Sequence, residues 1–203
     1  MLQTESPQKI KSVHERLLAS GKKLFAANGF ENTTTSAIAR DSGTSESQLI
    51  KYFQSKEGLL RAIFEDGWSR LAYVFTAASI SNGPEESLRV IFSLIVKTLR
   101  EDPELRDLML FEGRRIRAKS SQVLLTDGYF RLVKAVEDQA ALVLENSRLK
   151  GKVSPHAAAS ALIGMLESML RDQAIAERTS GKSTPSAEEI RVMFQALIQS
   201  WAV

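Results

Sequence analysis

Few side chains in this sequence are suited to covalent or metal chemistry. Its 203 residues include no cysteine, and the two histidines, His14 and His156, lie far apart. Structural and catalytic zinc sites are built mainly from clustered Cys and His ligands, so we expect no metal site. Glycine-rich phosphate loops and the HExxH and GxSxG motifs of hydrolases do not occur. The sequence therefore predicts neither an enzyme nor a bound cofactor.

A different chemistry, hydrogen bonding to nucleic acid, is indicated by the segment from Thr33 to Phe53, TTTSAIARDSGTSESQLIKYF. It predicts two short helices joined by a tight turn. Thr34 or Thr35 can cap the first helix, which should end near Ser42. Gly43 suits a left-handed C-terminal cap, and Ser45 suits the N-cap of the second helix. A short helix with a polar start and apolar anchors fits a DNA major groove.

The second of these helices has two sides. Leu49, Ile50 and Phe53 are expected to pack inward at helical spacing. The polar side consists of Glu46, Ser47, Gln48, Lys51 and Tyr52.

From Leu17 to Phe64 the sequence resembles the DNA-binding domain of the TetR family of bacterial transcriptional regulators. The matching residues, in chain order, are Leu24-Phe25, Asn28-Gly29-Phe30, the threonine run, Ile38-Ala39, Gly43-Thr44-Ser45, Leu49, Tyr52-Phe53, Ser55-Lys56-Glu57 and Leu59-Leu60. Two positions depart from the family pattern. Ser47 stands where a glycine or small residue is usual, and Ile50 stands where relatives often have a tyrosine whose hydroxyl reaches a phosphate.

The resemblance implies an all-α fold with an N-terminal three-helix helix-turn-helix domain and a C-terminal helical ligand-binding and dimerisation domain, about nine helices in all. We expect the DNA-binding domain at residues 1–56, a linking helix at 56–78 and the effector and dimerisation domain at 57–203. The implied function is that of a homodimeric repressor. It would bind a palindromic DNA operator and be released by an unidentified small-molecule effector.

Transferred by position, the resemblance also implies roles for single residues. Thr35 and Lys56 would face phosphates at helix starts, while Ser45, Ser47, Lys51 and Tyr52 would border the groove. Glu46 and Gln48 would lie nearest the base edges, where Gln48 could pair with adenine and Glu46 could accept from cytosine. Simpler interpretations exist for two of these residues: Ser45 as a cap only, and Lys51 as a solvated lysine.

Composition and charge agree with a DNA-binding protein without requiring one. The chain is 43% apolar and 25% charged, as in ordinary globular proteins. Residues 1–56 hold eight Lys/Arg and five Asp/Glu, which accounts for the whole net charge of +3. This excess suits a phosphate partner but also lies within ordinary scatter. No membrane span or secretory leader is evident, so we expect a cytoplasmic protein.

The remaining chain shows only helical spacing of apolar residues. Helices are predicted over residues 9–28, 56–78, 84–101, 103–111, 120–146 and 155–178, and from Ser186 onward, with a linker at 80–84. Aromatic residues of the middle helices that could line an effector pocket are Phe92, Phe111 and Tyr129, although plain core is the simpler interpretation. Arg114 and Arg115 lie in a basic run, EGRRIRAK, that either faces water or binds an acidic effector.

The last two helices are expected to form the dimer interface. A line of small residues, Ala157, Ala161, Gly164 and Ser168, would let another helix approach closely. The terminal helix has a broad apolar stripe that includes Ile190, Phe194, Leu197 and Trp201. This stripe is docked either on its own domain or on a second subunit. An all-helical ligand-binding or scaffolding dimer with weakened DNA affinity is the alternative function, and activation in place of repression stays open.

Overall fold

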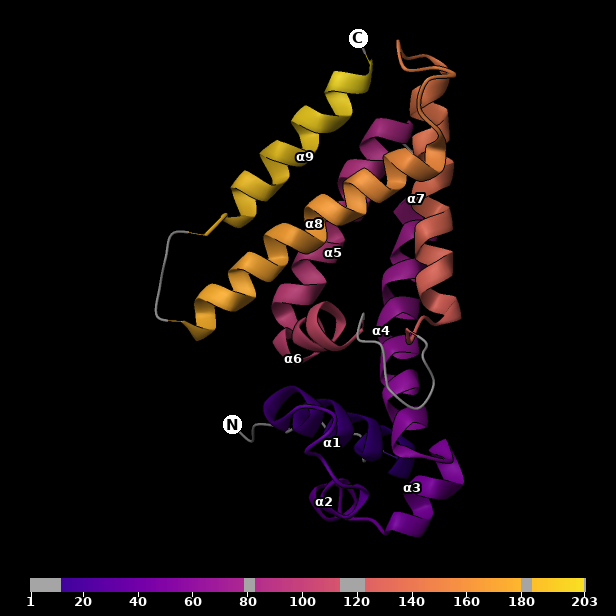
Figure 1. Cartoon of the computed structure of the whole chain (residues 1–203). Helices are drawn as coiled ribbons and strands as arrows, with labels where there is room; N and C mark the ends of the chain where they lie inside the picture. The colour runs from indigo at the N-terminus through magenta and orange to yellow at the C-terminus, as the bar shows by residue number, and fades with distance from the viewer. Residues whose placement is uncertain (1–11, 79–82, 114–122, 180–183, 203) are drawn as a thin grey trace, which may run out of the picture. The chain divides into compact units, whose positions relative to one another are not determined.

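The computed structural model describes residues 12–78, 83–113, 123–179 and 184–202; for residues 72–78 and 202 it describes the backbone only. The described residues form nine α-helices, one π-helical turn and no strand, which confirms the all-α prediction (Figure 1). They divide into two compact units between Ile63 and Phe64, so the division falls inside a long helix. None of the described helices is long and apolar enough to cross a membrane.

The N-terminal unit is built from short helices whose ends are set by local capping. Its helices are α1 (Val13–Asn28), α2 (Thr35–Asp41), α3 (Glu46–Phe53) and the first turns of α4 (Lys56–Ala78). The hydroxyls of Thr34 and Ser45 accept from first-turn amides of α2 and α3, as predicted. Gly29 and Gly43 follow α1 and α2 with φ of 79° and 62°, the left-handed region that favours glycine.

A small apolar core holds these helices together, and α1 and α4 pack closely at Gly21. A Cβ at Gly21 of α1 would lie 2.7 Å from Leu59 Cδ2 and 3.3 Å from Ile63 Cδ1 of α4. A larger residue at this position would require the Leu59 side chain to shift. Other buried side chains of the unit are Leu17, Phe25, Phe30, Ile38, Leu49, Phe53 and Leu60.

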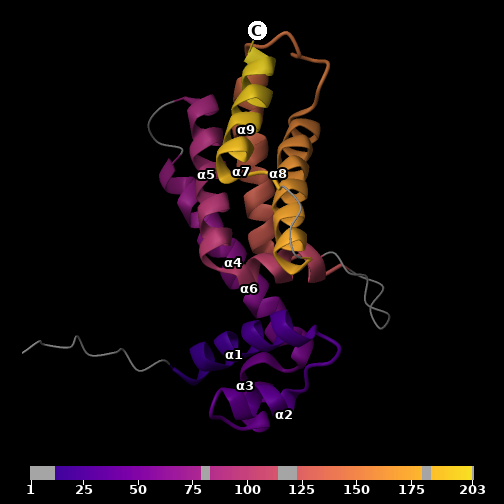
Figure 2. The ribbon, with the colours of Figure 1, turned by 90° about the vertical axis from the view of Figure 1, so that its left-hand side faces the viewer.

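The C-terminal unit is a bundle of longer helices. They are α5 (Pro84–Glu101), α6 (Pro103–Asp107), the π-helical turn η1 (Leu108–Glu112), α7 (Asp127–Glu145), α8 (Pro155–Arg178) and α9 (Ala187–Ala202). Helix α7 contacts both α5 and α8, and α9 contacts all three (Figure 2). The core between them is apolar and includes Leu88, Ile91, Val136, Leu162 and Leu166.

Two predicted helices of this unit differ from the structure. The helix expected over 120–146 begins at Asp127 in the structure. Residues 123–126 are not helical, and Thr126 occupies the N-cap position. The backbone N–H of Gly128 instead donates to the Glu65 carboxylate of α4 at 2.8 Å. The helix expected over 103–111 changes to π-helical geometry at Leu108.

Candidate functional site

Helix α3 presents its polar side chains to solvent while two apolar residues anchor it. Leu49 and Phe53 are 0% and 7% exposed and lie four residues apart, so they share one side of the helix. The predicted polar side, Glu46, Ser47, Gln48, Lys51 and Tyr52, is exposed throughout. A helix held from behind in this way keeps its polar face free for a partner.

Ile50 does not pack inward, and the prediction that it does was wrong. Its side chain is 47% exposed. The buried line of α3 is set by Leu49 and Phe53, and Ile50 lies about 100° around the helix from Leu49. It shares the presented face with Ser47 and Gln54, at the helical spacings of three and four residues. The free face of α3 thus contains an apolar side chain among polar ones.

Hydroxyl groups join α2 to α3 at their N-terminal ends. The Thr35 hydroxyl donates to Glu46 Oε2 at 2.6 Å, so two residues with separately predicted roles meet in the structure. Ser45 accepts from the backbone N–H of Gln48 at 3.3 Å, which confirms that it caps α3, while its predicted place beside the groove stays a prediction. Its hydroxyl also lies 2.8 Å from the Ser47 hydroxyl. These bonds fix the start of α3, where the polar face begins.

Lys56 is engaged inside the N-terminal unit. Its Nζ donates to the backbone oxygens of Phe30 at 2.8 Å and Thr33 at 2.9 Å. The same ammonium lies 4.3 Å from the centre of the Phe30 ring, within cation–π range. The side chain therefore ties the start of α4 to the loop after α1, and its predicted phosphate contact stays a prediction.

Tyr52 stands at the edge of the polar face and packs against α1. It is 46% exposed, and its ring meets His14 edge-on at 5.8 Å between centroids. The His14 ring also lies 5.0 Å from that of Phe53. His14 is thus a packing partner of α3.

The residues predicted for an effector pocket lie in different places. Phe92 is buried and stacks on Phe194 at 3.8 Å, and Tyr129 meets Trp68 edge-on at 5.4 Å. Phe111 lies 5.3 Å from the Arg178 guanidinium. Arg114 and Arg115 are outside the described residues.

Two small internal spaces, of about 30 and 20 Å³, lie next to each other in the C-terminal unit. Both are bordered by Trp68, Met109 and Glu167, the first also by Phe92 and the second by Tyr129. Each volume suffices for little more than one water molecule. The sequence analysis did not identify Glu167 as a lining residue. The feature that could have indicated it is an acidic residue directly after Leu166, which lies on the buried side of α8.

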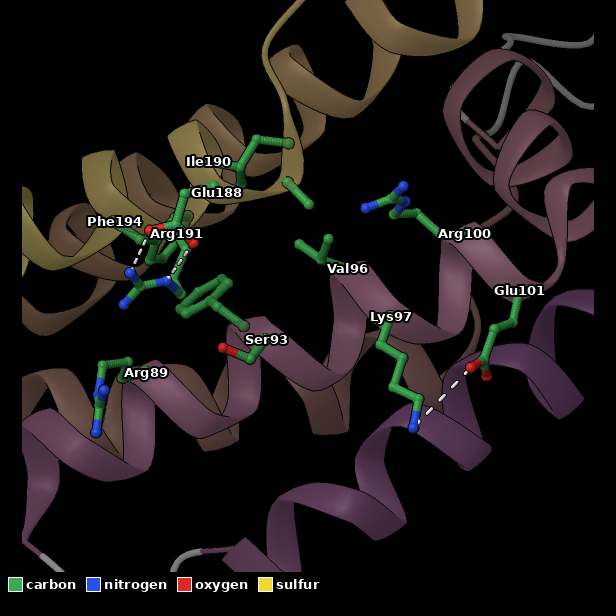
Figure 3. Close-up of a pocket in the computed structure, with 12 residues that line it drawn as sticks. Arg89, Ser93, Val96, Lys97, Arg100, Glu101, Glu188, Ile190, Arg191 and Phe194 are labelled. Carbon is green, nitrogen blue, oxygen red and sulfur yellow. Dashed lines mark hydrogen bonds and ion pairs between the residues drawn. The ribbon is translucent and has the colours of Figure 1, made fainter.

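A larger hollow of about 450 Å³ lies between α5 and α9 (Figure 3). Its floor is apolar and its rim is charged, with Phe92, Val96, Ile190 and Phe194 among the apolar residues. Sequence analysis did not find it, because the two helices that form it are far apart in the chain.

The two predicted dimer lines differ in exposure. Ala157, Ala161, Gly164 and Ser168 of α8 are all exposed. In contrast, Ile190, Phe194 and Trp201 of α9 are only 1%, 2% and 7% exposed, and Leu197 is half-buried. The apolar stripe of α9 is therefore docked on its own domain. The opposite face of α9 is exposed and contains Val192 and Met193, which are 48% and 51% exposed. Ala196, three and four residues further along the helix, lies on the same face.

Charged networks hold α4, α6, α7 and α8 in place. The Glu65 carboxylate accepts from the Gly128 N–H and from Ser69 and Arg131. Although burial opposes ionisation, these donors lower the pKa of Glu65 to about 2. The guanidinium of Arg106, 4% exposed, donates to both carboxylate oxygens of Glu177 at 3.0 and 2.6 Å. Both networks act as supports of the bundle.

Comparison with known proteins places this chain among bacterial regulators. The family model "Bacterial regulatory proteins, tetR family" matches residues 17–63, the segment that contains α2 and α3. The transcriptional repressor AcnR of Corynebacterium glutamicum is 26% identical over 190 residues, which is 91% of this chain and 92% of AcnR. The nucleoid occlusion factor SlmA of Vibrio vulnificus is 28% identical over 169 residues, 77% of this chain and 80% of SlmA.

The same fold occurs in the fatty acid degradation regulator FadR of Bacillus halodurans. The two structures superpose with a TM-score of 0.76 over 92% of this chain and 96% of FadR, at 14% sequence identity. At that identity the likeness concerns the fold alone.

Proposed function

Because the chain belongs to the TetR family of bacterial regulators, we propose that it is a homodimeric transcriptional repressor that binds a palindromic operator and is released by a small-molecule effector. The observation that carries this proposal is the presentation of α3. Its polar side is exposed from Glu46 to Tyr52, while Leu49 and Phe53 fix the helix to the N-terminal unit. Repression is favoured by the likeness to AcnR, a transcriptional repressor.

In this proposal the N-terminal unit reads DNA through the free face of α3. Gln48 would pair with adenine and Ile50 would contact the methyl group of thymine, two contacts suited to A·T pairs. Glu46 would accept from cytosine while its other contact, the Thr35 hydroxyl, holds the carboxylate in position. Lys51 would bind a phosphate. An exposed isoleucine is thus compatible with sequence reading, although it lacks the hydroxyl that relatives use.

The dimer would form through the exposed line of α8 and the outer face of α9. Small side chains at Ala157, Ala161 and Gly164 permit close helix packing, and Val192 and Met193 supply apolar area. A twofold axis between these helices would give two copies of α3. Such pairs read half-sites about 34–36 Å apart, or a multiple of this distance.

The effector would bind in the C-terminal unit, where the two internal spaces beside Trp68 would have to widen to admit it. Sites for small molecules usually have volumes of about 300–1,000 Å³. Without an enzyme motif, the protein would act by binding alone. Its place is the cytoplasm, because its partner is the chromosome.

The test is selection of genomic DNA fragments by the purified full chain at physiological salt, followed by sequencing. Recovery of one palindromic site beside a small set of genes is expected. Lys51→Ala should recover less DNA, and Lys152→Ala, which changes an exposed lysine of the C-terminal unit, should match the native chain. Many sites scattered over the chromosome would instead favour a role in nucleoid occlusion, the role that the name of SlmA gives. No site above background would refute the proposal and favour the ligand-binding scaffold.

A further inference from the structure

The hollow between α5 and α9, which we call the α5–α9 groove, has no role in the function proposed above. It measures about 450 Å³, against about 30 and 20 Å³ for the internal spaces. Its volume is within the usual range for small-molecule sites. Phe92, Val96, Ile190 and Phe194 supply an apolar floor, in which the Phe92 and Phe194 rings stack at 3.8 Å.

The rim of the groove is predominantly cationic. Arg89, Lys97, Arg100 and Arg191 face two acids, Glu101 and Glu188. The pairing within this rim is uneven. Arg89 pairs with Glu86 outside the lining, Arg191 pairs with Glu188, and Lys97 lies 3.9 Å from Glu101.

Arg100 is the cation that remains available. Within the described part of the chain its guanidinium makes no hydrogen bond or ion pair and has only a longer-range attraction to Glu177. Figure 3 shows its side chain directed toward the side of α5 on which α9 lies, whereas Lys97 is directed away from α9 toward Glu101. An unpaired guanidinium fork beside an apolar floor matches a carboxylate attached to an apolar chain.

We propose that the α5–α9 groove binds an amphipathic monocarboxylate, with its apolar chain on Phe92, Val96 and Phe194 and its carboxylate on Arg100. The excess of cations on the rim disfavours a cationic ligand of the same shape. A second subunit is a poor occupant of the groove. A twofold interface pairs each surface with its own copy, so two cationic rims would face each other. The groove is distinct from the DNA-reading face of α3, and it shares only Phe92 with the internal spaces beside Trp68.

Binding can be measured by isothermal titration of the full chain with three probes of equal chain length: decanoate, decan-1-ol and decyltrimethylammonium, all below their micelle-forming concentrations. Decanoate should bind more tightly than either of the others. Arg100→Gln should weaken decanoate about three- to tenfold, as expected for a partly exposed charge-assisted contact, and leave decan-1-ol unchanged. The matched control, Lys152→Gln, should change nothing, since Lys152 is an exposed residue outside the groove.

A second variant tests the location. Ser93 of α5 is exposed and lines the groove, so Ser93→Trp should fill the groove and abolish binding of decanoate. The unfolding midpoint of each variant shows that it is folded, and Arg100→Gln, on an exposed position, gives a result even when Ser93→Trp does not fold. The proposal is overturned when the native chain does not bind decanoate, or binds it no more tightly than decyltrimethylammonium. It is also overturned when Arg100→Gln, or a folded Ser93→Trp, binds decanoate as tightly as the native chain does. None of these titrations contains DNA, so each of these results leaves operator binding to be judged separately.

Discussion

Replacing Glu65 by glutamine removes the charge that joins α4 to the start of α7 and keeps the shape of the side chain. The carboxylate accepts from Gly128, Ser69 and Arg131, and its pKa falls from 4.5 to about 2. A shift of this size corresponds to about 3.4 kcal/mol at full effect. Because 36% of the side chain is exposed, solvent screens the interaction. We therefore expect Glu65→Gln to lower the free energy of unfolding by about 1–2 kcal/mol at pH 7.

The stabilisation by Glu65 depends on pH. A carboxyl group with a lowered pKa in the folded state stabilises the fold fully above its unfolded-state pKa of about 4.5. This stabilisation is lost as the pH falls from about 4.5 toward 2. The difference in unfolding free energy between the native chain and Glu65→Gln should therefore shrink between pH 5 and pH 3.

Urea unfolding followed by tryptophan fluorescence is a suitable assay, because both tryptophans, Trp68 and Trp201, lie in the C-terminal unit. Protein concentration must be held constant, since dimerisation would add to the apparent stability. Glu145→Gln is the control: its side chain is 64% exposed and pairs with Lys150 at the surface, so little change is expected. A difference for Glu65→Gln that is as large at pH 3 as at pH 7 would refute the reasoning.

Three further predictions concern DNA reading, the stability of the N-terminal unit and dimer assembly. Lys51→Ala should weaken binding to all DNA sequences and reduce the salt slope by about one, whereas Gln48→Ala should mainly relax sequence preference; an unchanged slope for Lys51→Ala removes its phosphate contact. Gly58→Ala should destabilise the N-terminal unit by about 1–3 kcal/mol in urea unfolding, because a Cβ there would overlap the Phe53 carbonyl oxygen, and native stability would contradict this. Gly164→Arg should give monomers in sedimentation and weaker operator binding, and dimers of native affinity would rule out the α8 interface.

The amino-acid sequence by itself determined where many helices begin and end. Thr34 and Ser45 cap α2 and α3, Gly43 takes the left-handed conformation between them, and Ser186, where the last helix was predicted to start, forms a capping box with Glu189. Each of these features depends on hydrogen bonds or backbone angles within about four residues, so neighbouring residue types suffice to predict it. The all-α class and the segment that resembles the TetR family follow from the same local patterns.

Only the tertiary structure decided which faces are buried and what they meet. Helical spacing placed Ile50 inside, yet Leu49 and Phe53 already fill the contact of α3 and leave it exposed. The stripe with Ile190 and Phe194 was open to either of two partners, and it packs on its own domain. The α5–α9 groove brings Phe92 against Phe194, about a hundred residues along the chain. An amphipathic pattern predicts that a helix face is covered but does not name the covering surface, because that depends on contacts between segments distant in sequence.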